Sequence, residues 1–427
     1  MGDELKYYRQ ALGINMIWNA YPIVFIVRDS FGIGPAGSAF TVLYWAVGLL
    51  FLIPFNIFTR IYSPNRILLV SWLSFWALGL AYWHYYPSPN GGTERTRETL
   101  TYVIPILFLF GLMFYPPEKS RYILVIMVFY TLFASVGLLY GIAHDPNWHF
   151  GERAAIKFNA NTNNSNPHAF ANNAICTIIA SLVVVGKVNG FFKKIFYYLA
   201  AIFSLGILVL TRTNSSFISL GLMTLVFLFF NGKGIIKGFF QVKVLATIAA
   251  IWAFLVFILS QFTFATYALT AYYQTFAKRF NNVIYTFSGM QVDEEQVAEI
   301  DNSSINRVYS FKYFREIFLG EEASLGKILF GEGYKAHFFD VPSLEAIVNQ
   351  GLLGFLFFDG FFFLLGITSL QQFMKPANDL SKFMAYFSIV LILGIFSGAR
   401  PIDLSMWLVY VFYIRFFGIY SLKKSLS

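Results

Sequence analysis

The residues best suited to chemistry lie in one long polar interval, 267–342, of a chain that is otherwise mostly apolar. This interval holds His337, which is the only histidine in the C-terminal half of the sequence. The ordinary pKa of a histidine side chain, about 6.5, suits proton removal at neutral pH. We therefore interpret His337 as a candidate general base that Asp340, three residues later, could orient or assist. The alternative is a structural, hydrogen-bonding histidine.

Positively charged side chains gather in the same interval. Lys278 adjoins Arg279, and Arg307, Lys312 and Arg315 fall within one short stretch. A guanidinium group matches two phosphate oxygens at once, so several together could neutralise a diphosphate leaving group without a metal ion. Taken singly, each of these charges is also explained as a solvated loop residue.

Two further connections carry candidate cations. Arg212 lies in the short stretch 210–216 between two apolar runs, where it is either a phosphate ligand or an anchor to lipid headgroups. Arg153 and Lys157 lie in the Asn-rich stretch 144–167.

Several kinds of site are absent from the sequence. There is no Gly-rich phosphate-binding loop followed by Lys-Ser/Thr, no cluster of His and Cys with metal-ligand spacing, and in the outer loops no paired acidic motif that suits a divalent ion. We therefore expect no cofactor and no metal, and a transferase of this kind needs a donor that is already activated. Asp359 is an acid within an apolar run, which suggests either function or a buried hydrogen bond. If this span is one straight helix, Asp359 lies too far from its outer end to take part directly in a reaction at the 267–342 loop.

The amino-acid composition indicates the class of protein to which these residues belong. Of 427 residues, 57% are hydrophobic and 12% are charged, about half the charged share of a soluble domain. We expect an all-α, polytopic membrane protein, a single integral domain over residues 1–427. The net charge of +9 is better explained by loop charges of a membrane protein than by binding of nucleic acid. One cysteine, Cys176, permits no disulfide within the chain.

Apolar runs of about 17–25 residues predict twelve spans. They cover 11–27, 37–59, 66–86, 100–115, 122–143, 168–186, 194–211, 215–231, 243–265, 343–369, 383–397 and 403–420. With a cytoplasmic N-terminus, Lys and Arg in the inner loops outnumber those in the short outer loops by more than two to one. We therefore predict that both termini are cytoplasmic and that the 267–342 loop, between the ninth and tenth spans, faces outward.

The long loop itself has a pattern. Apolar residues recur at three- and four-residue spacing from Ile305 to Phe318, after a polar stretch typical of a helix start. This predicts an amphipathic helix on the membrane surface or against the bundle. The sequence Gly331-Glu332-Gly333 then predicts a break before His337.

With these residues in place, the chain resembles the bacterial O-antigen polymerase and O-antigen ligase superfamily over about 166–358. Four stretches carry the resemblance, in order: NPHAFA at 166–171, LTRTNS at 210–215, SINR at 304–307, and GEGYKAH at 331–337 followed by GLLG at 351–354. The first is similar to the family's Asn-Pro-Asn-x-Phe-Ala. Two departures concern the candidate site residues: Phe338 stands where the family often has Asn after the histidine, and Arg212 comes earlier in its hairpin.

The resemblance implies a metal-independent glycosyltransferase of the bacterial inner membrane, whose donor is a glycan on undecaprenyl diphosphate at the periplasmic face. His337 would then deprotonate or orient the acceptor hydroxyl. Arg212, Arg279 and Arg307 would bind the diphosphate, while Arg153 and Lys157 would help to hold the second lipid substrate.

Two alternatives to polymerisation of lipid-linked repeat units stay open from the sequence. In a ligase the acceptor is the lipid A core oligosaccharide. A flippase for the same lipid-linked sugar belongs to another class and would line a central cavity with polar groups. A polymerase would also have a chain-length-regulating membrane protein as a possible partner.

Overall fold

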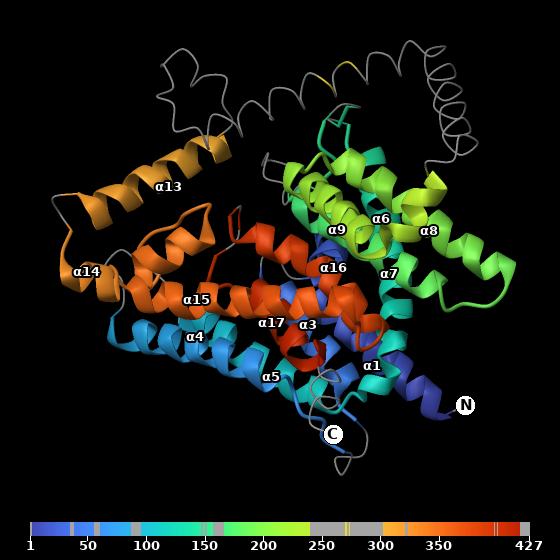
Figure 1. The fold of residues 1–427 in the computed structure, drawn as a ribbon, viewed down its shortest axis with the longest axis horizontal. Coiled ribbons are helices and arrows are strands. Elements are labelled where there is room, and N and C mark those ends of the chain that lie inside the picture. Colours follow the sequence, from blue (N-terminus) through green and yellow to red (C-terminus); the bar gives the residue numbers. More distant parts are fainter. Residues whose placement is uncertain are drawn as a thin grey trace.

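The computed structural model describes residues 2–34, 38–54, 60–86, 95–146, 148–149, 152–156, 166–239, 270, 273, 302–320, 323–396, 398 and 400–418. These residues form helices and no strand, which confirms the all-α prediction for this part of the chain. The elements are α1 (Gly2–Trp18), α2 (Ala20–Val24), the π-helix η1 (Phe25–Ser30), α3 (Ser38–Leu52), α4 (Arg66–Tyr85), α5 (Arg95–Met113), the 3₁₀ turn η2 (Pro117–Lys119), α6 (Ser120–Ala143), α7 (Pro167–Val185), α8 (Phe191–Thr211), α9 (Asn214–Phe239), α13 (Asn302–Leu319), α14 (Leu325–Phe330), α15 (Pro342–Met374), α16 (Asp379–Gly394) and α17 (Leu404–Phe416) (Figure 1).

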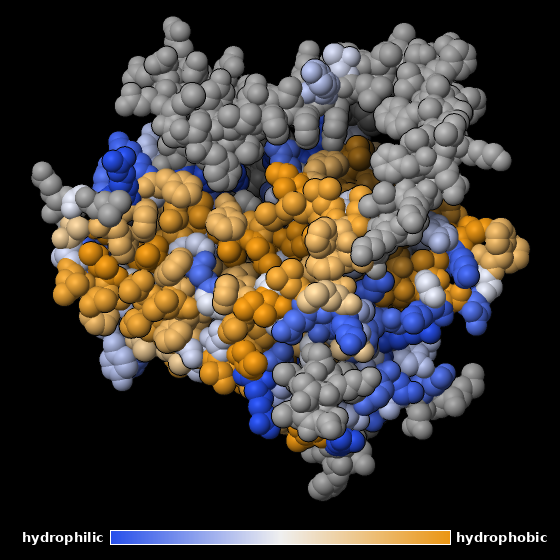
Figure 2. All heavy atoms as spheres, viewed as in Figure 1, coloured by the Kyte–Doolittle hydropathy of each residue, from blue (hydrophilic) through white to orange (hydrophobic). Residues whose placement is uncertain are grey.

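Six described helices are long and apolar enough to cross a membrane, and a bent pair at the N-terminus makes a possible seventh. The length and apolar composition of these helices indicate a membrane protein. Figure 2 shows much of the viewed surface to be hydrophobic. Helices α3 and α17, with 15 and 13 residues, are shorter than the spans predicted there, and α16, with 16 residues, begins and ends a few residues before the predicted 383–397. The predicted span at 243–265 lies outside the described residues. The count of twelve stays a prediction.

The predicted first span, 11–27, is wrong as a single straight helix. The chain is helical from Gly2 but bends by 82° between α1 and α2, at Asn19. The physical reason is Pro22, whose nitrogen has no proton to donate to the carbonyl of Trp18, the last residue of α1. A proline near the start of α2 therefore ends one helix and begins another.

Segments predicted to share a side of the membrane do lie together in the fold. The amide of Tyr334 donates to the carbonyl of Tyr86 (2.9 Å), which joins the 331–341 segment to the end of α4. At the other end of the bundle, a guanidinium nitrogen of Arg121 donates to the carbonyl of Lys187 (3.0 Å). Which end faces the cytoplasm stays a prediction.

Arg415 is the largest charged side chain buried in the core, with 0% of its surface exposed. Its Nε donates to the carbonyl of Leu112 (3.1 Å) and its Nη2 to that of Tyr115 (2.7 Å). These carbonyls lie at the C-terminal end of α5, where a helix leaves acceptors unpaired. A side chain of α17 thus caps α5.

We expect Arg415→Leu to destabilise the protein by about 2–4 kcal/mol, because two buried carbonyls lose a charged donor. The measurement is the thermal unfolding of the purified protein in detergent. Arg66→Leu, at an exposed position at the start of α4, serves as the control and is expected to unfold like the wild type. Equal melting of both variants would contradict a capping role for Arg415.

Candidate functional site

The site is built on two glycines that let two helix ends touch. Helix α14 stops at Gly331 (φ 69°), and the helical run from Pro342 is interrupted at Gly351 (φ 66°). A Cβ atom on Gly351 would lie 2.3 Å from the carbonyl carbon of Leu329, and one on Gly331 would lie 2.5 Å from the amide nitrogen of Gly351. Only glycine fits both the backbone angles and the contact.

The interruption at Gly351 leaves two carbonyls of α15 without helical partners. The carbonyl of Val348 accepts from the amide of Glu332, and that of Asn349 accepts from the amide of Gly333, both at 2.9 Å. The Gly331-Glu332-Gly333 break predicted from the sequence is thereby confirmed. The structure adds its partner, the opened turn of α15.

Helix α15 folds back on itself at Gly351, so the predicted span 343–369 is wrong as one continuous helix. The hydroxyl of Ser343 donates to Oδ1 of Asp359 at 2.5 Å. Sixteen residues of continuous helix would separate these residues by about 24 Å. The first half of α15 therefore runs antiparallel to the second. Asp359, expected to lie far from the loop, instead contacts the second residue of this hairpin.

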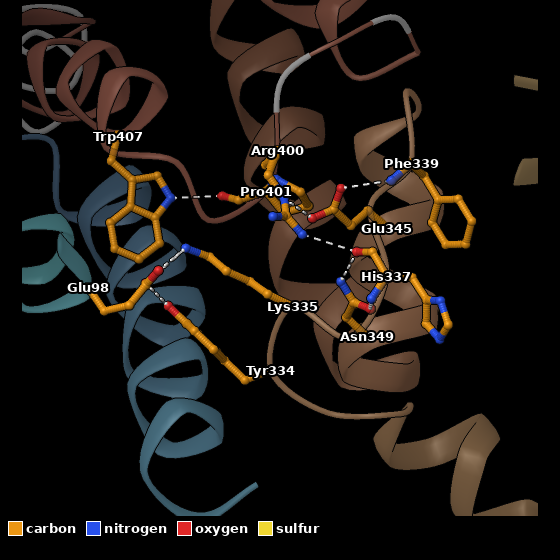
Figure 3. Close-up of polar contacts among 10 residues, drawn as sticks. All are labelled: Glu98, Tyr334, Lys335, His337, Phe339, Glu345, Asn349, Arg400, Pro401 and Trp407. Atoms are coloured by element: carbon orange, nitrogen blue, oxygen red, sulfur yellow. Dashed lines mark hydrogen bonds and ion pairs between the residues drawn. The ribbon is translucent and has the colours of Figure 1, made fainter. Parts of the chain in front are cut away.

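His337 is held in place through its main chain (Figure 3). The side-chain amide of Asn349 accepts from the amide nitrogen of His337 and donates to its carbonyl, each at 2.9 Å. Arg400 also donates to that carbonyl (3.1 Å), and its Nε contacts the carboxylate of Glu345 at 2.6 Å. Glu345 is 2% exposed. The ion pair of Arg400 with the buried Glu345 and the amide of Asn349 thus fix the backbone around the imidazole.

The imidazole of His337 has its own partners. Its Nε2 lies 2.5 Å from Oε2 of Glu332 and 3.1 Å from the hydroxyl of Tyr313 on α13. A carboxylate at Nε2 favours the tautomer with the proton there, which leaves Nδ1 as the nitrogen with a lone pair. The side chain is 30% exposed, so a substrate can reach it. In Figure 3 the ring points away from Asn349 and Arg400.

A cavity of about 400 Å³ lies between α13 and the segment that follows His337. Its lining comprises Asn306, Tyr309, Ser310, Lys312, Tyr313, Glu316, His337, Phe338, Phe339 and Asp340. His337 and Asp340 thus line one cavity, opposite a helix that carries cations. The side-chain partners of His337 are Glu332 and Tyr313, so a role of Asp340 in orienting it stays a prediction. Lys312 is the cation of the lining.

The helix predicted here is confirmed as α13, but its amphipathic character is not, because apolar side chains are also exposed on its outer face. Tyr313, Phe314, Ile317 and Phe318 pack near Phe339 and Val348. Phe311, which the spacing assigned to the apolar face, is 44% exposed. On the same helix Arg307 is half-buried and Arg315 is exposed, and neither lines the cavity.

Arg212 and Arg153 belong to another part of the fold. Arg212 ends α8 in the left-handed conformation (φ 49°), at the turn into α9. The amide of Ala154, next to Arg153, donates to the carbonyl of Leu210 at 2.9 Å. The two arginines predicted for substrate binding thus lie on neighbouring segments. Arg279 and Lys157 fall outside the described residues.

A second buried ion pair anchors the segment before His337. Nζ of Lys335 lies 2.7 and 2.8 Å from the two carboxylate oxygens of Glu98 on α5, and the hydroxyl of Tyr334 donates to the same carboxylate (Figure 3). Lys335 has a left-handed backbone (φ 50°), which is uncommon outside glycine. Burial lowers the pKa of Lys335, and the negative charge of Glu98 opposes that shift.

Glu98→Gln is expected to destabilise the protein by about 3–5 kcal/mol, because it leaves the ammonium of Lys335 buried without its counter-charge. The double variant Glu98→Gln with Lys335→Met removes both charges and is expected to recover part of the loss. Thermal unfolding of the three proteins in detergent measures this. A double variant no more stable than the single one would contradict the ion-pair explanation.

Sequence reasoning missed Glu332, Tyr313, Asn349 and Arg400. Glu332 lies five residues before His337 inside the recognised glycine break, so proximity was a usable signal. Arg400 was considered only as a loop charge, and nothing in the sequence connects it to Glu345. Within the described residues, no group of three or more His, Cys, Asp or Glu side chains could hold a metal ion.

Comparison of the chain with models of known protein families gives no match, and comparison with curated proteins gives none either. Neither comparison identifies an O-antigen polymerase or ligase, so the resemblance of the four stretches stays a prediction.

Proposed function

We propose that the protein is a glycosyltransferase that polymerises oligosaccharide repeat units carried on undecaprenyl diphosphate. The observation that supports this best is the contact of His337 with Glu332 at 2.5 Å, at the wall of a cavity that Lys312 also lines. A carboxylate-bound imidazole suits proton removal from a hydroxyl, and a nearby cation suits a phosphorylated donor.

In the proposed reaction, Nδ1 of His337 accepts the proton of the acceptor hydroxyl as its oxygen attacks the anomeric carbon of the donor sugar. The bond from that carbon to the diphosphate oxygen breaks, and undecaprenyl diphosphate leaves with the electron pair. Glu332 stabilises the imidazolium that forms. Lys312, which lines the cavity, neutralises the departing charge, and no metal takes part in this scheme. Arg307 lies on the same helix outside the lining, and Arg279 lies outside the described residues, so their roles stay predictions. Arg212, at the α8–α9 turn, has no part in this step.

The proposal includes a location and partners. The reaction takes place at the periplasmic face of the bacterial inner membrane, with both termini in the cytoplasm. Donor and acceptor are both lipid-linked glycans, and a membrane protein that regulates chain length is a possible partner. The clustering of 331–341 with the end of α4 and the start of α5 supports a shared outer face, because all three were predicted to lie there.

The test is reconstitution of the purified protein in liposomes with an undecaprenyl-diphosphate-linked repeat unit. Growth of lipid-linked polymer supports the polymerase. Transfer only to added lipid A core oligosaccharide would instead identify a ligase, which is the first alternative.

Transport of the same lipid-linked sugar is the second candidate, because one observation favours it. Helix α15 is broken at Gly351 and carries Asp359 within the span, and broken helices with buried acids are common in transporters. Movement of the labelled lipid across the bilayer without glycan extension would establish transport and exclude the transferase.

A further inference from the structure

A second cavity lies beside the candidate site, between the end of α4 and α14. It has a volume of about 570 Å³, within the range of about 300–1,000 Å³ that is usual for small-molecule sites. Its lining includes Ala81, Tyr82, Tyr85, Lys327, Phe330 and Gly331. Apart from the ammonium of Lys327, these residues present aliphatic, aromatic or glycine surface.

The surroundings of this cavity are apolar as well. Tyr85 is 82% exposed, Phe330 is 53% exposed and Leu325, at the start of α14, is 73% exposed. Figure 2 shows largely hydrophobic surface at the end of the molecule where Figure 1 places α14. An apolar cavity that opens onto apolar surface and carries one cation is complementary to a lipid that has an anionic end.

One carboxylate, that of Glu332, contacts a lining residue of each cavity. Oε1 of Glu332 lies 3.4 Å from Nζ of Lys327, which lines the apolar cavity. Oε2 of the same group lies 2.5 Å from Nε2 of His337, which lines the polar cavity. An anion held by Lys327 would therefore be separated from the imidazole by a single side chain. A lipid in one cavity and its attached sugar in the other would then meet beside Glu332.

We propose that the α4–α14 cavity binds the first isoprene units of the lipid carrier, with Lys327 contacting a phosphate of its diphosphate. This inference rests on the proposed function and specifies where the lipid part of the donor enters. The hydroxyl of Tyr82 donates a hydrogen bond to the carbonyl of Phe330 (2.8 Å), so Tyr82 presents its aromatic ring to the cavity. Lys327 is 37% exposed, which leaves its ammonium within reach of a headgroup.

The experiment uses the full-length protein in phosphatidylcholine nanodiscs and a geranylgeranyl diphosphate that bears a benzophenone. After irradiation we expect the label on peptides that contain Tyr85 or Phe330. Lys327→Gln is expected to reduce labelling about tenfold, the effect of losing one charge-assisted phosphate contact. Ala81→Trp, which fills the cavity from an exposed position, is expected to abolish it.

Matched controls lie on α8, on a different part of the surface. Ile202→Trp adds the same indole at a position that is 66% exposed, and Lys193→Gln removes an exposed charge. Both are expected to label like the wild type. Equal labelling by a benzophenone phosphatidic acid would show a site for ordinary phospholipid and overturn the proposal.

Parallel measurement of polymer growth separates the two claims. Wild-type labelling of Ala81→Trp and Lys327→Gln, in a preparation that makes polymer, would overturn the lipid site and leave the transferase standing. Labelling confined to this cavity in a protein that makes no polymer would support the lipid site and overturn the transferase.

Discussion

Replacing His337 with alanine is expected to reduce sugar transfer by about two to four orders of magnitude, the usual contribution of a general acid–base group. The fold should tolerate the change, because Asn349 and Arg400 hold the main chain of His337 and its ring is 30% exposed. The measurement is the amount and length of polymer made by the reconstituted variant at equal protein concentration.

Two conservative variants make this test specific. Glu332→Gln keeps the shape of the partner but removes the charge that stabilises an imidazolium, and we expect a large part of the same loss. Tyr313→Phe removes only the hydroxyl at 3.1 Å and is expected to have a smaller effect. Thermal unfolding close to that of the wild type confirms folding of all three. Polymer of wild-type length from His337→Ala would rule out His337 as the base.

Gly351→Ala is expected to destabilise the protein by about 3–5 kcal/mol, from two independent causes. The residue has φ 66° and ψ −162°, a conformation that only glycine adopts readily. The added Cβ would also lie 2.3 Å from the carbonyl carbon of Leu329, a backbone atom that cannot rotate away. We expect little folded protein, measured by size exclusion and thermal unfolding in detergent.

Gly360→Ala is the matched control, because it lies nine residues further along α15 and a Cβ there meets nothing within 4 Å. It is expected to be neutral or slightly stabilising. Gly331→Ala should behave like Gly351→Ala, since the two glycines form the two sides of one contact. If Gly351→Ala and Gly360→Ala unfold at the same temperature, the close contact of α14 with α15 is not required for the fold.

Much of the fold could be predicted from the sequence, because long apolar runs leave few structural choices. A backbone in an apolar surrounding must satisfy its hydrogen bonds internally, which makes each such run a helix. The runs at 66–86, 122–143 and 168–186 correspond closely to α4, α6 and α7. The glycine break at 331–333 and helix α13 were also predictable, from local backbone preference and from spacing.

Only the tertiary structure decided how α15 is arranged. The sequence GLLG at 351–354 lies in an apolar run and is compatible with a continuous helix. Whether Gly351 leaves the helical conformation depends on the backbone of Leu329 lying against it, a contact between residues 22 positions apart in the sequence. That contact brings Asp359 beside Ser343 and exposes the carbonyls that hold Glu332 and Gly333.

The candidate site, like the fold, could be predicted from the sequence only in part. Residue type alone singled out His337, because an imidazole next to cations is rare in an apolar chain. The neighbours of His337 could not be found from residue type. Asn349, Glu345 and Arg400 come close to His337 only in the folded chain, and Arg400 is 63 positions away in the sequence. The sequence determined which groups can carry out the chemistry. The packing of helix ends through two glycines determined which of them meet.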